Sequence, residues 1–191
     1  ANLGRDLGDN LLWEDFTVTH ADKYDVLPMA YEGDVTIMSS ADGVLTLPAV
    51  EVQRCVSKIS YNITVAPAVA DIELRSVQLF SVLRSVSVFD MAAAPSDDPD
   101  DYTDCPEVGL SGQQAADDCY LLPNMQGMVA TITDQRQKNP ENAPANASYL
   151  LIRAVRGSKI LAYYIYLGGN NTSDFNVRAN THYRLNISIL G

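Results

Sequence analysis

The sequence has few of the residues that catalytic and metal sites usually need. It contains two histidines, three cysteines and one tryptophan among 191 residues. It also has no Gly-x-Ser-x-Gly elbow, no glycine-rich phosphate loop and no His-Glu-x-x-His pair. We therefore expect a protein that is not an enzyme and that needs no cofactor.

Long hydrophobic runs are absent as well. No stretch approaches the roughly 18–20 apolar residues of a membrane-spanning helix, and no basic-then-apolar signal peptide opens the chain. We expect an export signal to be absent or already removed. A net charge of -11 argues against nucleic acids and anionic membrane surfaces as main partners, because both would repel the protein. With 47% hydrophobic residues the chain is nevertheless not a disordered acidic tail.

Basic side chains are missing from one long window. Residues 85–135 contain ten acids and no Lys or Arg, so the rest of the chain, with 14 acids and 13 bases, is almost neutral. The excess charge therefore belongs to one local segment. We expect a solvated, partner-facing acidic loop from about residue 90 to residue 118.

Alternation of apolar and polar residues dominates the sequence, and this pattern is typical of half-buried β-strands. Tyr183–Ile189 is the clearest case and is expected to be antiparallel, and Ile59–Val65 repeats the pattern. Tyr149–Val155 and Ile160–Leu167 flank a short Gly-containing turn, which predicts a hairpin. Further β-prone segments are Ile72–Phe89, which forms one long strand or two short ones, and the weaker Leu11–Thr19 and Val35–Met38.

Many short strands with turn-rich connections predict an all-β protein built from antiparallel β-sandwiches. Pro, Gly, Asn and Asp clusters place loops at 91–118, 134–146 and 168–180. The acidic loop near the midpoint suggests two domains, an N-terminal sandwich over 1–95, either complete or lacking part of its sheet, and a C-terminal sandwich over 96–191 that contains the acidic loop. The alternative is a single sandwich with a long inserted loop.

The three cysteines suggest different roles. Cys55 lies in a strand-like run and is best explained as a buried thiol. Cys105 and Cys119 are either two unpaired thiols or a disulfide whose loop of about 15 residues is worth roughly 3 kcal/mol. No Cys–His spacing is typical of zinc, because His20 and His182 lie far from the cysteines in sequence. Both histidines are expected at the surface.

Clustered aspartates in the acidic loop raise the question of calcium, which prefers carboxylate oxygens. Counted from Asp98, the sixth residue is Thr103 rather than Gly, and the twelfth is Gly109 rather than Glu, so the EF-hand pattern fails. A solvated loop is therefore favoured, with calcium binding of another kind as the alternative. The candidate calcium ligands are Asp97, Asp98, Asp100, Asp101 and Asp104.

Two segments together resemble the fimbrillins of Bacteroidales, the subunits of type V pili. Val50–Ile59 is similar to the family's Arg-containing strand in the N-terminal domain. The run Tyr164–Tyr183, with Gly168-Gly169 and an Asn/Asp-rich loop before a last alternating strand, resembles the C-terminal signature. Within this run Phe175 and Val177 are expected to hold an ordered loop against the sandwich.

The resemblance implies two tandem transthyretin-like β-sandwiches and a structural or adhesive subunit of a surface fimbrium attached to the outer membrane. It implies export as a lipoprotein precursor and polymerisation with other pilus subunits by strand exchange. A host or bacterial surface ligand is a further implied partner. No lipidation cysteine or donor tail is visible, so we expect a processed or truncated subunit, or a tip or anchor component that accepts a strand. The alternative is a monomeric module that binds a glycan or calcium at the cell surface.

Overall fold

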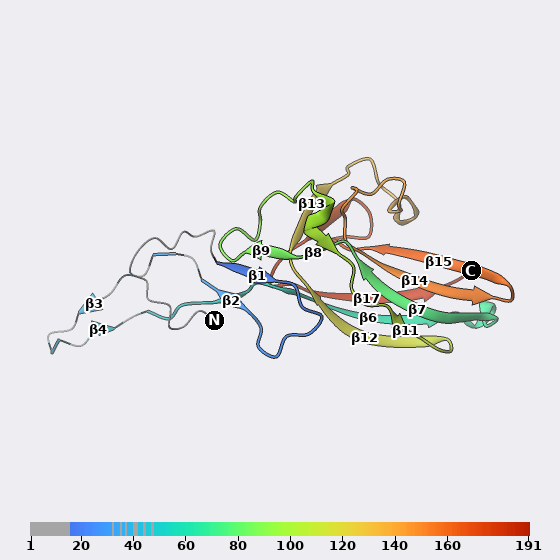
Figure 1. The fold of residues 1–191 in the computed structure, drawn as a ribbon, viewed down its shortest axis with the longest axis horizontal. Helices are drawn as coiled ribbons and strands as arrows, with labels where there is room; N and C mark the ends of the chain where they lie inside the picture. Colours follow the sequence, from blue (N-terminus) through green and yellow to red (C-terminus); the bar gives the residue numbers. More distant parts are fainter. Residues whose placement is uncertain are drawn as a thin grey trace.

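The computed structural model describes residues 16–31, 33–34, 36, 38–39, 42–43, 45–46 and 48–191. In these residues the chain is all-β, with short 3₁₀ turns at Pro67–Val69, Pro99–Asp101 and Gln135–Gln137 and no α-helix (Figure 1). No helix in this part of the chain is long and apolar enough to cross a membrane. The strands are β1 (Thr17–Thr19), β2 (Met29–Ala30), β3 (Met38–Ser39), β4 (Leu45–Thr46), β5 (Gln53–Arg54), β6 (Ser57–Val65), β7 (Ile72–Phe80), β8 (Val82–Leu83), β9 (Ser85–Ser87), β10 (Tyr102–Thr103), β11 (Val108–Gly109), β12 (Gln114–Leu121), β13 (Asn124–Met128), β14 (Tyr149–Arg156), β15 (Lys159–Tyr166), β16 (Asp174–Val177) and β17 (His182–Ile189).

Two sheets form the main β-sandwich. One has the strand order β11-β7-β14-β15 and the other β12-β6-β17. Alternate residues of β6 are buried, as the sequence pattern predicted, because every second side chain of a strand points to the same face. The two inner faces share one hydrophobic core. Its fully buried members include Ile59, Ile63, Ile72, Leu74, Val82, Leu121 and Ile152.

The predicted hairpin is confirmed. β14 and β15 pair antiparallel in unbroken register from Tyr149 opposite Tyr166 to Arg156 opposite Lys159. Gly157 in the turn has a φ of 57°, in the left-handed region that glycine enters without steric cost. Ile72–Phe89 divides into β7, β8 and β9, and the first break falls at Ser81 with a φ of 55°.

The last strand has the predicted alternation but the opposite direction. β17 pairs with β6 in parallel, from His182 opposite Lys58 to Ile189 opposite Val65. The prediction of an antiparallel strand was therefore wrong. Alternation reports which face of a strand is buried, whereas direction depends on how the chain reaches its partner, which a local pattern does not contain.

Part of the expected acidic loop is a strand. β12 pairs with β6 antiparallel over eight residue pairs, so the loop predicted to reach residue 118 ends before Gln114. Asp117 and Asp118 on β12 are exposed at the edge of the sandwich. Asp118 Oδ2 lies 2.5 Å from Lys58 Nζ. Pairing with β6 imposes an extended conformation on a segment whose own sequence does not alternate.

The strands on both sides of residue 95 belong to the same two sheets. β6 and β7 pair with β12, β14 and β17, and all of them contribute to one core. The expected boundary between 1–95 and 96–191 runs through this core, so no division of the sandwich lies there. The single sandwich with an inserted loop, the alternative drawn from the sequence, matches this arrangement.

A smaller hydrophobic cluster joins the N-terminal segment around β1 to the sandwich. Val18, Cys55 and Leu122 are buried together, and β1 pairs with β9. Cys55 is a buried thiol, as predicted. Of the two weak strand predictions, Leu11–Thr19 is represented by β1, and Val35–Met38 only by Met38 at the start of β3; residues 11–15, 35 and 37 lie outside the described residues.

Candidate functional site

Two strands leave one side of the sandwich open. β15 is the last strand of the four-stranded sheet and β17 is the last strand of the three-stranded sheet. The Tyr163 hydroxyl lies 3.4 Å from the Gly191 carbonyl oxygen, so β15 and the end of β17 are neighbours. In the part of the chain that the structure describes, no further strand pairs with their outer edges.

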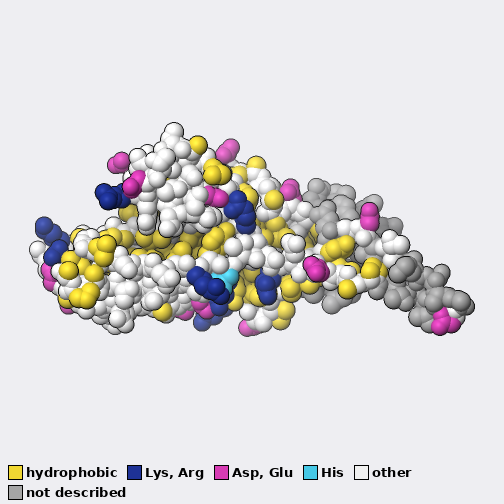
Figure 2. Space-filling view, turned by 180° about the vertical axis from the view of Figure 1, so that it is seen from behind, with side chains coloured by type: hydrophobic (Ala, Val, Ile, Leu, Met, Phe, Trp, Pro, Cys, Tyr) yellow, Lys and Arg dark blue, Asp and Glu magenta, His cyan; other side chains and the backbone are white. Residues whose placement is uncertain are grey.

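The inward side chains of these two strands are incompletely covered. Six apolar residues pack against the core yet remain partly exposed, and from the side opposite to Figure 1 hydrophobic side chains form a band along the long axis of the molecule (Figure 2). Inward apolar residues of a closed sandwich edge would be buried. We call these six residues the β15–β17 stripe: Leu161, Tyr163, Ile165, Tyr183, Leu185 and Ile187.

The opposite side of the sandwich is bridged at one end and has a pocket lined by Cys105 and Cys119. A short connection over residues 110–113 links β11 to β12, and Leu74 N donates a hydrogen bond to Gly112 O in this connection. The outer strand β12 also bears Asp117 and Asp118, and charges on an edge strand oppose the addition of another strand. The side formed by β15 and β17 has no such connection between its edge strands in the described chain.

The chain between these two strands is ordered, as predicted. Phe175 and Val177 on β16 are 1% and 0% exposed, and β16 pairs with β13. Gly168 has a φ of 146°, and a Cβ atom there would lie 1.8 Å from the Asp174 carbonyl oxygen. The glycine thus lets the start of β16 cross directly over the end of the hairpin.

A buried lysine adds to this loop and was not singled out by sequence reasoning. Lys138 Nζ donates hydrogen bonds of 2.7 Å to the carbonyl oxygens of Asn170 and Asp174 and lies 4.9 Å from the centre of the Phe175 ring. Burial lowers the pKa of Lys138 to about 8, and nearby Asp174 partly opposes this shift. The lysine connects residues 135–138 to the loop before β16, and no local sequence pattern would have revealed it.

The five candidate calcium ligands do not converge. Among the described residues, no three of them bring their oxygens within 4.8 Å of one another. Two have structural roles instead: Asp98 Oδ1 accepts a hydrogen bond of 2.9 Å from Asp100 N, and Asp104 Oδ1 accepts one of 3.2 Å from Ser81 N. Calcium binding by the acidic loop stays a prediction.

Cys105 and Cys119 both line a pocket of about 180 Å³ between the two sheets. They are free thiols in the structure, and their disulfide stays a prediction. Burial raises the pKa of each thiol to about 12; Asp22 adds to the shift at Cys105, and Asp117 adds to it at Cys119. Both cysteines are therefore protonated thiols at neutral pH.

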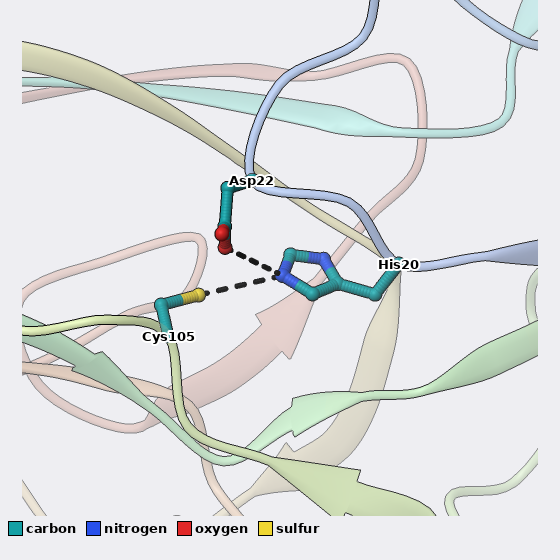
Figure 3. A group of neighbouring side chains, drawn as sticks. All are labelled: His20, Asp22 and Cys105. Atoms are coloured by element: carbon teal, nitrogen blue, oxygen red, sulfur yellow. Dashed lines mark hydrogen bonds and ion pairs between the residues drawn. The ribbon is translucent and has the colours of Figure 1, made fainter.

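Three side chains that sequence reasoning did not bring together, His20, Asp22 and Cys105, lie close to one another in the structure. His20 Nε2 lies 3.4 Å from Cys105 Sγ and 3.6 Å from Asp22 Oδ1, and the side chains of Cys105 and Asp22 point to the same ring nitrogen (Figure 3). The His20 side chain is 8% exposed, which corrects the expected surface position. Burial lowers the pKa of His20, although Asp22 partly opposes this. A His-x-Asp spacing was visible in the sequence, but Cys105 lies 85 residues away.

Comparisons with known proteins give distant matches. Residues 119–187 match the model of a family described as "Domain of unknown function (DUF4906)". No curated protein matches the sequence. Among solved structures, the chain is similar to the tip fimbrial protein Mfa3 from Porphyromonas gingivalis with a C-terminal truncation, at 17% identity and a TM-score of 0.43. That similarity covers 73% of this chain and 48% of the other, so the chain spans about half the length of that structure.

Proposed function

We propose that the protein is a structural and adhesive subunit of a bacterial surface pilus, and that it accepts a strand from a neighbouring subunit along the β15–β17 stripe. The observation behind this proposal is the open side of the sandwich, where inward apolar side chains of two edge strands stay partly exposed. The C-terminal sequence signature, which forms β15, the loop, β16 and β17, supports the same function.

An incoming strand would interact with this surface through both its backbone and its side chains. Its backbone would pair with the free N–H and C=O groups of β15 or β17, and its alternate side chains would cover the stripe. β15 and β17 each have eight residues, which corresponds to a paired length of roughly 27 Å. The partner is therefore an extended segment of about eight residues with apolar side chains at alternate positions.

This function places the protein outside the cell, in a fimbrium attached to the outer membrane, with other pilus subunits as its partners. It requires no catalysis and no cofactor, because strand pairing and burial of apolar surface provide the binding free energy. Whether the subunit belongs to the shaft, the tip or the anchor depends on whether it also donates a strand.

One observation favours a second function. The outer face of the four-stranded sheet has an aromatic cluster, in which Phe80 stacks on Tyr149 at 5.1 Å and Tyr149 lies 5.6 Å from Tyr164. Aromatic rings on an open face are suited to stacking against sugar rings, so a surface glycan-binding module is the alternative. The two functions use opposite faces of β15.

Adjacent tyrosines on β15 separate these functions. Tyr163 belongs to the stripe, whereas Tyr164 faces outward in the aromatic cluster. With a photo-cross-linking phenylalanine analogue at position 163, we expect cross-links to a neighbouring subunit in assembled fibres, because the stripe is the contact surface. The same analogue at position 164 should give few, and mass spectrometry identifies the linked peptides. Cross-links to subunits only from position 164 would contradict the proposal.

A further inference from the structure

One nitrogen atom of His20 faces two partners. Nε2 lies 3.4 Å from Cys105 Sγ and 3.6 Å from Asp22 Oδ1, and both contacts are drawn to the same atom in Figure 3. A ring nitrogen has either one proton or one lone pair in its plane, so it cannot make a good hydrogen bond to both partners. The longer distance also exceeds the 2.7–3.2 Å of an N–H···O hydrogen bond.

The spacing of the three atoms is that of ligands around a tetrahedral metal ion. With Zn–S near 2.3 Å and Zn–N and Zn–O near 2.0–2.2 Å, tetrahedral angles place nitrogen and oxygen about 3.3–3.5 Å apart and nitrogen and sulfur about 3.5–3.6 Å apart. The measured 3.4 Å from nitrogen to sulfur and 3.6 Å from nitrogen to oxygen each lie within about 0.1 Å of these values, and all three ligand atoms lie within 4.8 Å of one another. Among the described residues this is the only such group of three or more His, Cys, Asp or Glu side chains.

The other ring nitrogen has no partner among the described residues of the protein. His20 Nδ1 is the only buried side-chain nitrogen or oxygen in the described chain that has no hydrogen-bond partner. An unpaired polar atom on a side chain that is only 8% exposed costs roughly 1–3 kcal/mol. Zinc bound at Nε2 would place the ring proton on Nδ1, where a water molecule has to accept its hydrogen bond.

Access and charge also fit a cation. A second pocket, which Arg84 and Asp104 also line, reaches His20 and Asp22, and the pocket between the sheets reaches Asp22 and Cys105. The Asp22 side chain is 57% exposed, so one ligand already reaches the surface. The carboxylates of Asp22 and Asp104 provide negative charge beside the two softer ligands.

We propose that His20, Asp22 and Cys105 bind one zinc ion, with water as the fourth ligand. The nitrogen and sulfur ligands favour zinc over calcium or magnesium, which prefer oxygen. Binding forms a Zn–S bond and releases the thiol proton to solvent. The ion would join the segment after β1 to the segment beside β7, where Cys105 N donates to Leu79 O, and so stabilise the N-terminal segment on the sandwich. This proposal does not depend on the pilus function.

The test is titration of the full chain with zinc chloride under a phosphine reductant, followed by calorimetry and thermal melting. We expect one zinc per chain with a Kd of about 1 µM or tighter. At a hundredfold excess over Kd the melting temperature should rise by about 5–10 °C. Cys105→Ser and Asp22→Asn should each weaken binding about tenfold or more; the exposed Asp22 makes the second variant safe for folding.

Two matched variants serve as controls. Cys119→Ser and His182→Ala should bind zinc as the unmodified chain does, and Cys119→Ser also prevents the predicted disulfide from occupying Cys105. With cobalt in place of zinc, thiolate-to-metal charge-transfer absorption should appear in the unmodified chain and in Cys119→Ser but not in Cys105→Ser. No stoichiometric binding below about 100 µM, or equal binding by Cys105→Ser and the unmodified chain, would overturn the proposal.

Discussion

Replacement of Leu185 by lysine should abolish assembly while leaving the subunit folded. Leu185 lies in the middle of β17 and of the stripe, partly exposed before assembly and covered afterwards. An incoming strand would have to bury the new ammonium group without a partner, at a cost of at least about 3 kcal/mol. We therefore expect the yield of detergent-resistant assemblies on unboiled gels to fall by about 100-fold.

The adjacent position provides the control. Asn186→Lys places the same charge on the same strand, but on its exposed outer face. Assembly of this variant should be nearly unchanged, because the side chain stays in water. Circular dichroism melting of both monomers checks that each is folded. Equal loss of assembly in both variants, or in neither, would argue against the stripe as the contact surface.

Gly168→Ala should produce the largest loss of stability among glycine substitutions in the described chain. The added Cβ atom would lie 1.8 Å from the Asp174 carbonyl oxygen, and the φ of 146° is itself unfavourable for an L-residue. Because the atoms that the Cβ would meet belong to the backbone, the start of β16 must move. We expect the free energy of unfolding in urea to fall by about 3 kcal/mol.

Gly157→Ala, in the turn of the β14–β15 hairpin, separates the two causes. Its φ of 57° is also in the left-handed region, but no atom lies within 4 Å of the added Cβ. This variant should lose only about 1–2 kcal/mol. A loss at position 168 no larger than that at position 157 would mean that β16 does not depend on its close approach to Gly168.

The features that the sequence predicts best are those with a local physical cause. Alternating side chains identify β6, β15 and β17 because the buried face of a strand recurs every second residue. The hairpin follows from two such runs around Gly157. The buried anchors Phe175 and Val177 could be recognised because they are isolated apolar residues within a polar loop.

What the sequence does not show depends on contacts between distant segments. β12 contains the run Gln114–Asp118, which does not alternate, and its extended shape comes from pairing with β6. The parallel direction of β17 and the continuous core across residue 95 follow from the path of the whole chain. Likewise His20 and Cys105 meet only because β1 packs beside β9 and the acidic segment returns along β7.

The acid-rich residues 85–135 are less separate from the β-sandwich than their charge suggests. They contribute β10 and β11 to the sheets, and their ion pairs reach the sandwich: Glu107 Oε1 lies 2.8 Å from Arg153 Nη1. Hydrogen bonding to Ser76, with the charge of Arg153, lowers the pKa of Glu107. Several of their carboxylates thus act within the fold, and the remainder face solvent.

Amide hydrogen exchange, compared between the isolated subunit and the assembled fibre, tests strand addition most directly. In the isolated subunit, the amides on the outer edges of β15 and β17 should exchange rapidly, because no strand pairs with them in the described chain. In the fibre, exchange at 159–166 or 182–189 should slow by about 100-fold, since an added strand protects every second amide. Unchanged exchange at both strands, with new protection elsewhere, would contradict the proposed mode of assembly.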